Sequence, residues 1–433
     1  MHQTPFRTAV VGTLLGVSFL AGVDRVLQGP APAAATPQAE ARARYAAAAA
    51  SPAKAVAARW KAPEDPRTVG MDADALGSAV RALEAQVERE GFPGAALAVG
   101  RGAELALEAG VGRIRWDGDR VSPDSSLYDI ASLTKVVATT TAAMLLVEDG
   151  RLELDAPVSR YLPEWRSASR TGENSDGRKD EVTIRHLLTH TSGLPAGAGT
   201  WGTEEEARAR LIATPLKADP GKRVEYSDVG FVVLYAALER AAGQPIPELL
   251  EARVFGPLGM ESTTFDPALD CRGCAPTAWT GTAEIVGRVH DPIAAKLGGE
   301  NAGNAGLFST ASDLGRFAAM LASGGELKGV RVLAEETVKK FTTRQPDAAT
   351  RALGWDTRDE RGIGAAGLAM SAGSFGHTGF TGTSLWVDPE RKTWTVLLTN
   401  RTYAPRATVA IQKVRRTVHE DVVQAADAVV MGD

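Results

Sequence analysis

The sequence predicts an α+β fold, in which one antiparallel sheet is built from both ends of the folded body and carries flanking helices. Short apolar runs typical of strands lie near both ends, at residues 95–109 and 373–398. The residues between them, about 152–325, follow a mainly helical pattern with long loops. Strands from both ends can share a sheet if this middle part forms an inserted all-helical lobe.

The first predicted elements lead from a helix to a hairpin and then to a buried helix. Asp72 is a good N-cap for an amphipathic helix over residues 73–90, which a Gly- and Pro-containing segment ends. Two apolar runs, 95–99 and 105–109, are separated by Arg101-Gly102 and predict a β-hairpin. An almost uncharged helix then begins near Ser132 and ends at Gly150.

The later elements are predicted from the same signals of periodicity, caps and turns. Expected helices cover 182–194 (closed by a Ser-Gly turn), 228–242, 246–255, 310–323 and about 406–423, and expected strands cover 373–377, 382–387 and 393–398. Ser132 would then lie at the junction of the sheet and the helical lobe, where pockets are common.

The N-terminal residues resemble an export signal. Arg7 precedes an uncharged apolar run at 8–23, and small residues follow up to Ala35. We therefore expect residues 1–35 to be a cleaved signal peptide or an uncleaved signal anchor, and residues 36–68 to be an Ala/Pro-rich linker. The main body would be periplasmic or extracellular, either free or tethered to the membrane.

Composition and cysteine content narrow the class of protein. The 433 residues are 44% hydrophobic and carry a net charge of −5, without the basic block that a nucleic-acid-binding protein would need. Cys271 and Cys274 are candidates for a local disulfide in an exported chain. A thioredoxin-like site would need a βαβ setting and a zinc site two more ligands, so we expect no metal and no cofactor.

Ser132 and Lys135 form the pattern Ser-x-x-Lys at the start of the uncharged helix, so their side chains share one face. Burial would lower the pKa of the lysine, and a partly neutral amine could take the proton of the serine hydroxyl. The alternative is a helix cap with a lysine that reaches solvent. A second match, Ser51 to Lys54, lies in the Ala-rich segment and is interpreted as chance.

Two further stretches could complete a site around Ser132. Tyr226 follows a Pro-Gly turn and directly precedes a helix that Ser227 or Asp228 would cap, so its hydroxyl could relay a proton. His377, Thr378 and Gly379 lie on a predicted strand, and the N–H of Phe380 could bind an oxyanion.

The other histidine patterns give weaker evidence for a functional site. His186 and His190 have the i,i+4 spacing of a metal helix, but Leu187 occupies the position where a metalloprotease has glutamate, so both are interpreted as structural. His290-Asp291 could belong to a Ser-His-Asp triad, but the chain has no Gly-x-Ser-x-Gly turn to accompany it.

These stretches occur in the order Ser-x-x-Lys, Tyr-Ser-Asp and His-Thr-Gly. With "IRHLLTHTSGL", "PGKRVEYSDVGF", "GPLGMESTTF", "AGLFSTASDLGRF" and "FGHTGFTGTSLWVDPE", they resemble the serine β-lactamase and penicillin-binding protein superfamily, in particular class C β-lactamases, D-alanyl-D-alanine carboxypeptidases and related esterases. The resemblance covers about residues 72–423 and implies a β-lactamase/transpeptidase-like domain, which we place at 69–427.

The resemblance implies roles for the candidate residues. Ser132 would be the acylated nucleophile, and Lys135 and Tyr226 would share the acid–base work. The N–H groups of Ser132 and Phe380 would form the oxyanion hole. The segment formed by His377, Thr378 and Gly379 would bind substrate where many relatives have Lys-Thr-Gly.

Two departures from the family pattern bear on the substrate. Asp228, also a substrate-binding candidate, replaces the asparagine usual in enzymes that hydrolyse β-lactams, and a carboxylate cannot donate as an amide does. His377 replaces lysine, so a fixed positive charge for a substrate carboxylate is missing.

We therefore expect a monomeric exported hydrolase of the esterase or D,D-carboxypeptidase type, with weak β-lactamase activity at most. Its substrate would be a small ester or peptide, with peptidoglycan-derived peptides among the candidates, and no nucleic acid. The alternative is a non-catalytic cell-wall or ligand-binding module on the same fold.

Overall fold

A computed structural model describes residues 56, 60–167, 177–267, 271–404 and 409–430. The predicted signal segment, residues 1–35, and most of the predicted linker lie outside the described residues. The end of that linker, however, packs on the folded body. The Trp60 ring stacks on Trp394 at 5.8 Å between centroids, and a 3-10 turn at Pro66–Val69 is capped by Asp65. The linker prediction is thus wrong from residue 60 onward, because Trp60 buries its ring in the core.

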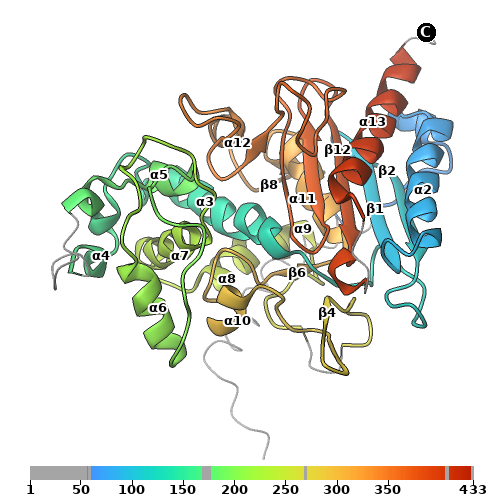
Figure 1. Cartoon of the computed structure of the whole chain (residues 1–433). Coiled ribbons are helices and arrows are strands. Elements are labelled where there is room, and N and C mark those ends of the chain that lie inside the picture. The colour runs from blue at the N-terminus through green and yellow to red at the C-terminus, as the bar shows by residue number, and fades with distance from the viewer. Residues whose placement is uncertain (1–55, 57–59, 168–176, 268–270, 405–408, 431–433) are drawn as a thin grey trace, which may run out of the picture. The chain divides into compact units, whose positions relative to one another are not determined.

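The predicted sheet is confirmed: it is antiparallel and draws its strands from both ends of the body (Figure 1). Its order is β2-β1-β12-β11-β10-β9. The strands are β1 (Gly94–Arg101), β2 (Glu104–Gly112), β9 (Asp356–Thr357), β10 (Phe375–Thr378), β11 (Ser384–Asp388) and β12 (Thr393–Thr399). The central pair joins β1 to β12, with Leu97 opposite Leu397.

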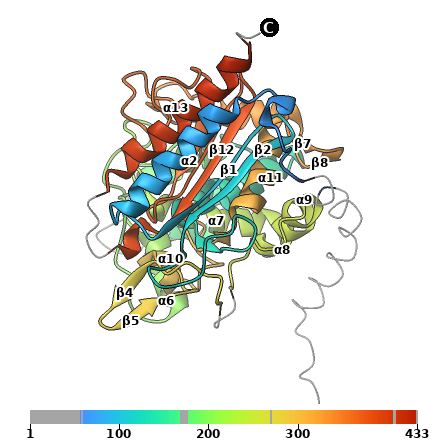
Figure 2. The ribbon, with the colours of Figure 1, turned by 90° about the vertical axis from the view of Figure 1, so that its right-hand side faces the viewer.

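Both faces of the sheet are covered by helices, and the alternation of side chains along β1 decides which core each residue joins. Ala95, Leu97 and Val99 belong to the core beneath α2 (Ala73–Glu88) and α13 (Ile411–Val430), which lie side by side in Figure 2. Ala96 and Ala98 belong to the main core, which includes Leu314 and Phe317 of α11 (Ala311–Ala322). Asp72 caps α2 as predicted, since its carboxylate accepts from the N–H groups of Asp74 and Ala75.

The helical lobe is smaller than predicted, because α11 packs against β1, β11 and β12 and therefore belongs to the sheet. The other described helices are α4 (Pro163–Ser167), α5 (Ile184–Leu188), α6 (Glu204–Ala213), α7 (Asp228–Ala242), α8 (Ile246–Leu250), α9 (Gly256–Leu258), α10 (Pro292–Lys296) and α12 (Glu335–Thr342). Two-stranded pairs join β3 (Tyr128–Asp129) to β6 (Phe308–Ser309), β4 (Ala278–Thr280) to β5 (Ala283–Ile285), and β7 (Glu326–Leu327) to β8 (Val330–Arg331).

Helix α5 ends at Leu188, whereas the sequence pattern predicted a helix to residue 194. The Thr189 hydroxyl donates back to the Arg185 carbonyl, and His190 takes a φ of +58°, which ends the helical path. This early end brings the ring of His190 to Tyr226, as described below.

The helix that begins near Ser132 is buried along its length, as its lack of charge predicted. It comprises a 3-10 turn (Ala131–Leu133), a π-helical segment (Lys135–Thr140) and α3 (Thr141–Glu148). By length and hydropathy Ala131–Glu148 could span a membrane, but 83% of it is buried inside the fold, as expected for the core helix of a globular body.

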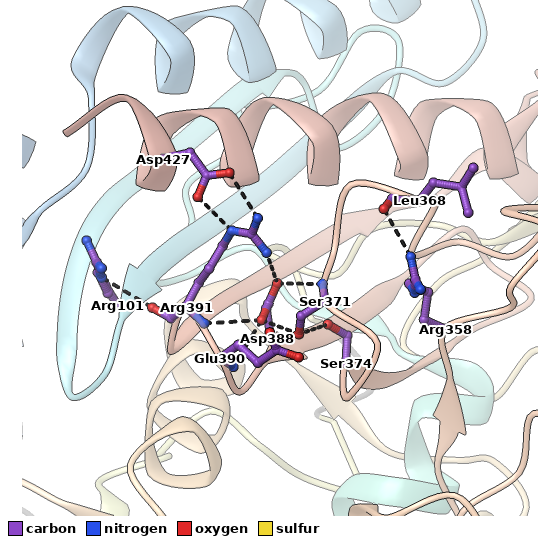
Figure 3. A network of polar contacts seen from close by, with 9 residues as sticks. All are labelled: Arg101, Arg358, Leu368, Ser371, Ser374, Asp388, Glu390, Arg391 and Asp427. Carbon is purple, nitrogen blue, oxygen red and sulfur yellow. Dashed lines mark hydrogen bonds and ion pairs between the residues drawn. The ribbon is translucent and has the colours of Figure 1, made fainter. Parts of the chain in front are cut away.

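A buried carboxylate joins the C-terminal helix to the sheet (Figure 3). Asp388, at the end of β11, accepts hydrogen bonds from Ser371 and from the backbone N–H of Glu390. Arg391 contacts Asp388 and also Asp427 of α13, at 2.7 Å. This network fixes the β11–β12 turn against α13.

Cys271 and Cys274 form a disulfide in the structure. It closes a short loop beside Leu127, whose backbone N–H donates to the Gly273 carbonyl.

Candidate active site

Ser132 lies on a tight turn that the backbone enters in an unusual conformation. Ala131 has a φ of +47°, which an alanine adopts only under constraint. The buried Asp129 carboxylate supplies that constraint by accepting from the N–H of Ala131 at 2.8 Å and from the N–H of His290 at 2.7 Å. Burial raises the pKa of Asp129 to about 6.

The Ser132 hydroxyl does not cap the helix, because the N-cap residue is Ile130 and no side chain caps the turn. Instead its oxygen accepts a hydrogen bond from Lys135 at 3.1 Å. This contact agrees with the predicted shared face, and it argues against the alternative of a simple helix cap.

Lys135 is fully buried and donates to three acceptors. Its Nζ lies 3.1 Å from Ser132 Oγ, 2.6 Å from Asp228 Oδ1 and 2.8 Å from the Asn304 carbonyl oxygen. An ammonium has three protons to donate, which matches these three partners in number.

The charge of Lys135 corrects the expectation from the sequence. Burial by itself lowers the pKa of Lys135, but the neighbouring Tyr226 and Asp228 outweigh burial and raise it above the ordinary value. A partly neutral lysine was therefore the wrong expectation. In this structure Lys135 is an ammonium that holds the Ser132 oxygen.

Asp228 occupies the first position of α7 and pairs with Lys135. The hydroxyl of Ser227 caps the helix by accepting from the N–H of Gly230 at 2.9 Å. A carboxylate at a helix N-terminus is favoured by the helix dipole. The structure thus places Asp228, a candidate for substrate binding, in contact with Lys135, with a quarter of its side chain still exposed.

Tyr226 is surrounded by basic groups. Its hydroxyl interacts with the Lys135 ammonium, which lies 4.8 Å from the ring centroid. The ring packs on His190 at 4.5 Å and lies 6.0 Å from the ring of His377. The guanidinium of Arg351 lies 5.4 Å from the same ring.

The hydrogen bonds of the two histidines determine their tautomers. His190 Nδ1 accepts from the N–H of Ser227 at 3.0 Å, so the neutral ring carries its proton on Nε2. His377 Nδ1 lies 2.9 Å from the Thr378 carbonyl oxygen, which can only accept, so its proton is on Nδ1. Among the described residues neither Nε2 atom has a hydrogen-bond partner, although both are buried.

Burial, strengthened by the positive charges of Arg351 and Lys135, lowers the pKa of His190 and of His377 well below the ordinary value. Both rings are therefore neutral near pH 7. His377 consequently supplies no positive charge at the position where relatives carry lysine.

The segment that follows β10 is hydrogen-bonded to the turn that carries Ser132. Thr381 donates to the Asp129 carbonyl at 2.8 Å, and Thr383 donates to the Ile130 carbonyl at 3.0 Å. Gly379 lies so close that a Cβ there would stand 2.5 Å from the Ile130 oxygen, which explains why glycine is needed. The buried Arg415 of α13 donates to the carbonyls of Gly379 and Thr383.

Phe380 follows in the turn between β10 and β11. Within the part of the chain that the structure describes, no residue accepts a hydrogen bond from its backbone N–H. Its ring is 62% exposed, stacks on His290 at 5.7 Å and lies 5.1 Å from the Arg401 guanidinium. Thr378 is half-buried at the end of the strand.

Two contributors to this arrangement, Arg351 and Asn304, were not found from the sequence. Arg351 belongs to no motif, and its guanidinium lies 4.0 Å from Asp356, at the limit for an ion pair. Asn304 acts through its backbone carbonyl, which no side-chain pattern can reveal. His190 was interpreted as structural, and its Nδ1 does accept from the backbone N–H of Ser227, while its ring also packs on Tyr226.

A cavity of about 980 Å³ lies elsewhere, between α11, α12 and the edge of the sheet. None of the residues that line it belongs to the set around Ser132. The candidate site around Ser132 is therefore separate from this cavity.

Comparison with known proteins shows the family of this chain. A family model described as Beta-lactamase matches residues 79–419. A Salmonella agona protein named "Putative D-alanyl-D-alanine carboxypeptidase" is 29% identical over 378 residues, which cover 79% of this chain and 86% of the relative.

Solved structures share the fold at lower identity. A penicillin-binding protein homologue from Caulobacter crescentus is 20% identical, covers 82% of this chain and 99% of its own, and has a TM-score of 0.66. EstCE1, described as a hydrolase with promiscuous acyltransferase activity, is 24% identical, covers 80% of this chain and 99% of its own, and has a TM-score of 0.62.

Proposed function

The chain belongs to the Beta-lactamase family, and on that premise we propose that it is an exported serine hydrolase that cleaves an ester or a D-amino-acid amide through an acyl-enzyme on Ser132. The observation that carries the proposal is the hydrogen bond from the Lys135 ammonium to Ser132 Oγ. Among the described residues no backbone group bonds to the Ser132 hydroxyl, and a lysine that only balanced the charge of Asp228 would not need to contact it.

Tyr226 is the proposed proton carrier. Because Lys135 donates to the Ser132 oxygen, the serine's own proton is free to be donated elsewhere, and the Tyr226 hydroxyl interacts with the same ammonium. Ser132 Oγ would bond to the substrate carbonyl carbon while its proton passes through Tyr226 to the leaving oxygen or nitrogen. The bond between the carbonyl carbon and the leaving group then breaks.

Water would complete the cycle by the reverse route. It attacks the acyl carbon, its proton passes through Tyr226 to Ser132 Oγ, and the acid is released. The N–H groups of Ser132 and Phe380 would stabilise the oxyanion in both steps, which for one donor is worth about 3 to 4 kcal/mol in related chemistry.

The leaving group would lie beside Tyr226, among His190, His377 and Arg351. The Nε2–H of His190 can donate, the Nε2 of His377 can accept, and Arg351 supplies the positive charge that His377 lacks. A leaving group with a carboxylate would suit this side, in agreement with the name of the Salmonella relative. β-Lactam hydrolysis is less favoured, because the Asp228 carboxylate that replaces the usual amide is paired with Lys135.

Product analysis tests the proposal. The full chain is incubated with p-nitrophenyl acetate and with a diacetyl-lysyl-D-Ala-D-Ala peptide, alongside Ser132→Ala. Ser51→Ala is a matched control, because Ser51 begins the other Ser-x-x-Lys match. We expect turnover of at least one substrate in the parent and in Ser51→Ala, and its loss in Ser132→Ala. Undiminished turnover by Ser132→Ala would contradict the proposal.

A further inference from the structure

We infer that Phe380, which contacts His290 and Arg401, forms an apolar shelf for the acyl group, and that the preferred substrates carry an apolar acyl chain of several carbons. The inference rests on the proposed function, because it assigns the acyl side of the same site. We call Phe380, His290 and Arg401 the acyl shelf.

The Phe380 ring is exposed but held in place. It is 62% exposed, in a turn whose next residue, Thr381, is buried. His290 stacks on the ring at 5.7 Å with an interplanar angle of 26°, and the Arg401 guanidinium lies 5.1 Å from its centroid. Arg401 Nε also donates to the Phe380 carbonyl at 3.0 Å. The apolar surface is therefore preformed, so a ligand would not have to order it on binding.

The shelf adjoins the reacting carbonyl. Gly379 and Thr381 both touch the segment immediately before Ser132, and Phe380 lies between them in sequence. His290 is tied to the same segment, since its N–H donates to Asp129. If the Phe380 N–H binds the oxyanion, the substituents of that carbonyl lie next to the Phe380 ring.

The route of the proton then determines whether the leaving group or the acyl group lies against the acyl shelf. The leaving group takes its proton from Tyr226, whose ring contacts His190 and His377 and lies near Lys135 and Arg351. The ring of Phe380 contacts a different set, His290 and Arg401. The leaving group is thus assigned to the basic side at Tyr226, and the acyl group to the shelf.

The shelf is suited to an uncharged chain. Burial lowers the pKa of His290, so its ring is neutral near pH 7. Arg401 already uses Nε on the Phe380 carbonyl, and its charge faces the ring. Covering the exposed ring with a chain of several methylenes would remove apolar area from water on both partners, which favours binding of a longer acyl chain.

The test compares kcat/KM for p-nitrophenyl octanoate with that for p-nitrophenyl acetate in the full chain. The variants are Phe380→Ala and Phe380→Leu. Trp201→Ala is the matched control, because Trp201 is also 62% exposed and lies over an arginine, Arg210, at 4.9 Å. Thermal unfolding and Ser132 acylation by the acetate ester are measured for every variant.

We expect the ratio of kcat/KM for the octanoate ester to kcat/KM for the acetate ester to exceed 1 in the parent chain. This ratio should fall about tenfold or more in Phe380→Ala. It should recover in part in Phe380→Leu and stay at the parent value in Trp201→Ala. A ratio that Phe380→Ala leaves unchanged, with Ser132 still acylated, overturns the acyl shelf alone. Absence of Ser132 acylation in the parent chain overturns the proposed function, and the acyl shelf with it.

Discussion

Lys135 Nζ lies 2.6 Å from Asp228 Oδ1, a contact that joins the buried helix beginning near Ser132 to the first turn of α7 over a sequence separation of 93 residues. The lysine is fully buried, whereas 26% of the aspartate side chain is exposed. Burial alone would lower the pKa of Lys135, but Tyr226 together with this pair raises it above the ordinary value. The candidate site thus contains an ammonium beside Ser132, and the proposed mechanism therefore assigns the base function to Tyr226.

Asp228→Asn should move the alkaline limb of the kcat/KM profile to lower pH. The substitution removes the negative charge that helps to raise the pKa of Lys135, so the ammonium is lost at lower pH than in the parent. The free energy of unfolding should fall by about 1 to 2 kcal/mol, since one partner of a largely buried pair remains. A pH–rate series measures the first effect and urea unfolding the second.

Asp155→Asn is the control for this prediction, because Asp155 pairs with Arg185 at the surface. The alkaline limb of its kcat/KM profile should lie at the same pH as that of the parent. An alkaline limb that Asp228→Asn leaves in place would show that the charge of Lys135 does not depend on the pair.

Tyr226→Phe should abolish most turnover without unfolding the protein. The ring that packs on His190 is kept, and only the hydroxyl that interacts with Lys135 is lost. We expect kcat to fall about 10²- to 10⁴-fold, the usual range for a general acid–base group. Steady-state kinetics and a melting curve check this, with Tyr161→Phe as a control in the helical lobe. Retention of kcat within a factor of a few would rule out Tyr226 as the proton carrier.

Gly379→Ala should damage both the site and its stability. The new methyl group would stand 2.0 Å from Thr383 Oγ1 and 2.5 Å from the Ile130 carbonyl oxygen, so β10 must move away from the Ser132 turn. The expected loss is about 1 to 3 kcal/mol of unfolding free energy, typical of overpacking, together with most of kcat. Gly364→Ala, where the nearest atom is 3.9 Å away, should behave as the parent. Equal stability of the two variants would contradict the close approach.

The buried histidines predict a loss of stability in acid. Burial lowers the pKa of His419 from 6.5 to about 4, so the unfolded chain binds its proton more readily than the folded one. The resulting stability is fully present above pH 6.5 and is lost as pH falls toward 4. For His419 the loss is about 3 kcal/mol. His190 and His377 act in the same direction, because their pKa values are also lowered.

Asp129 and Asp313 act in the opposite direction, because burial raises the pKa of each to about 6. The contribution of His419 is therefore isolated by subtracting the profile of His419→Asn from that of the parent, both measured by denaturant unfolding between pH 4 and 7. The difference should shrink as pH falls. A difference independent of pH would show that His419 is not buried as a neutral ring.

Much of the fold was predictable, because its signals are local. Helix α7 begins and ends as predicted, since Ser227 caps one end and Gly243 takes the left-handed conformation at the other. The strands from both ends of the body were recognisable by alternation. The length of α5 was not, because the turn at His190 depends on contacts with Tyr226 and Phe231 that follow much later in the sequence.

The contrast between local signals and contacts of distant segments also explains which features of the site could be predicted. The spacing of Ser132 and Lys135 predicts their shared face, because it is a property of one helical turn. The charge of Lys135 was predicted wrongly, because Tyr226 and Asp228, which raise its pKa, come from a distant segment. Arg351 was not found, since its relation to Tyr226 exists only in three dimensions.

The most direct test of the central claim is the mass of the trapped intermediate. The full chain is mixed with a slowly hydrolysed p-nitrophenyl ester, quenched in acid and analysed by intact-protein and peptide mass spectrometry. The account predicts one added acyl group, located on the peptide that contains Ser132, and none in Ser132→Ala. An acyl group on another residue, or turnover by Ser132→Ala at the parent rate, would contradict it.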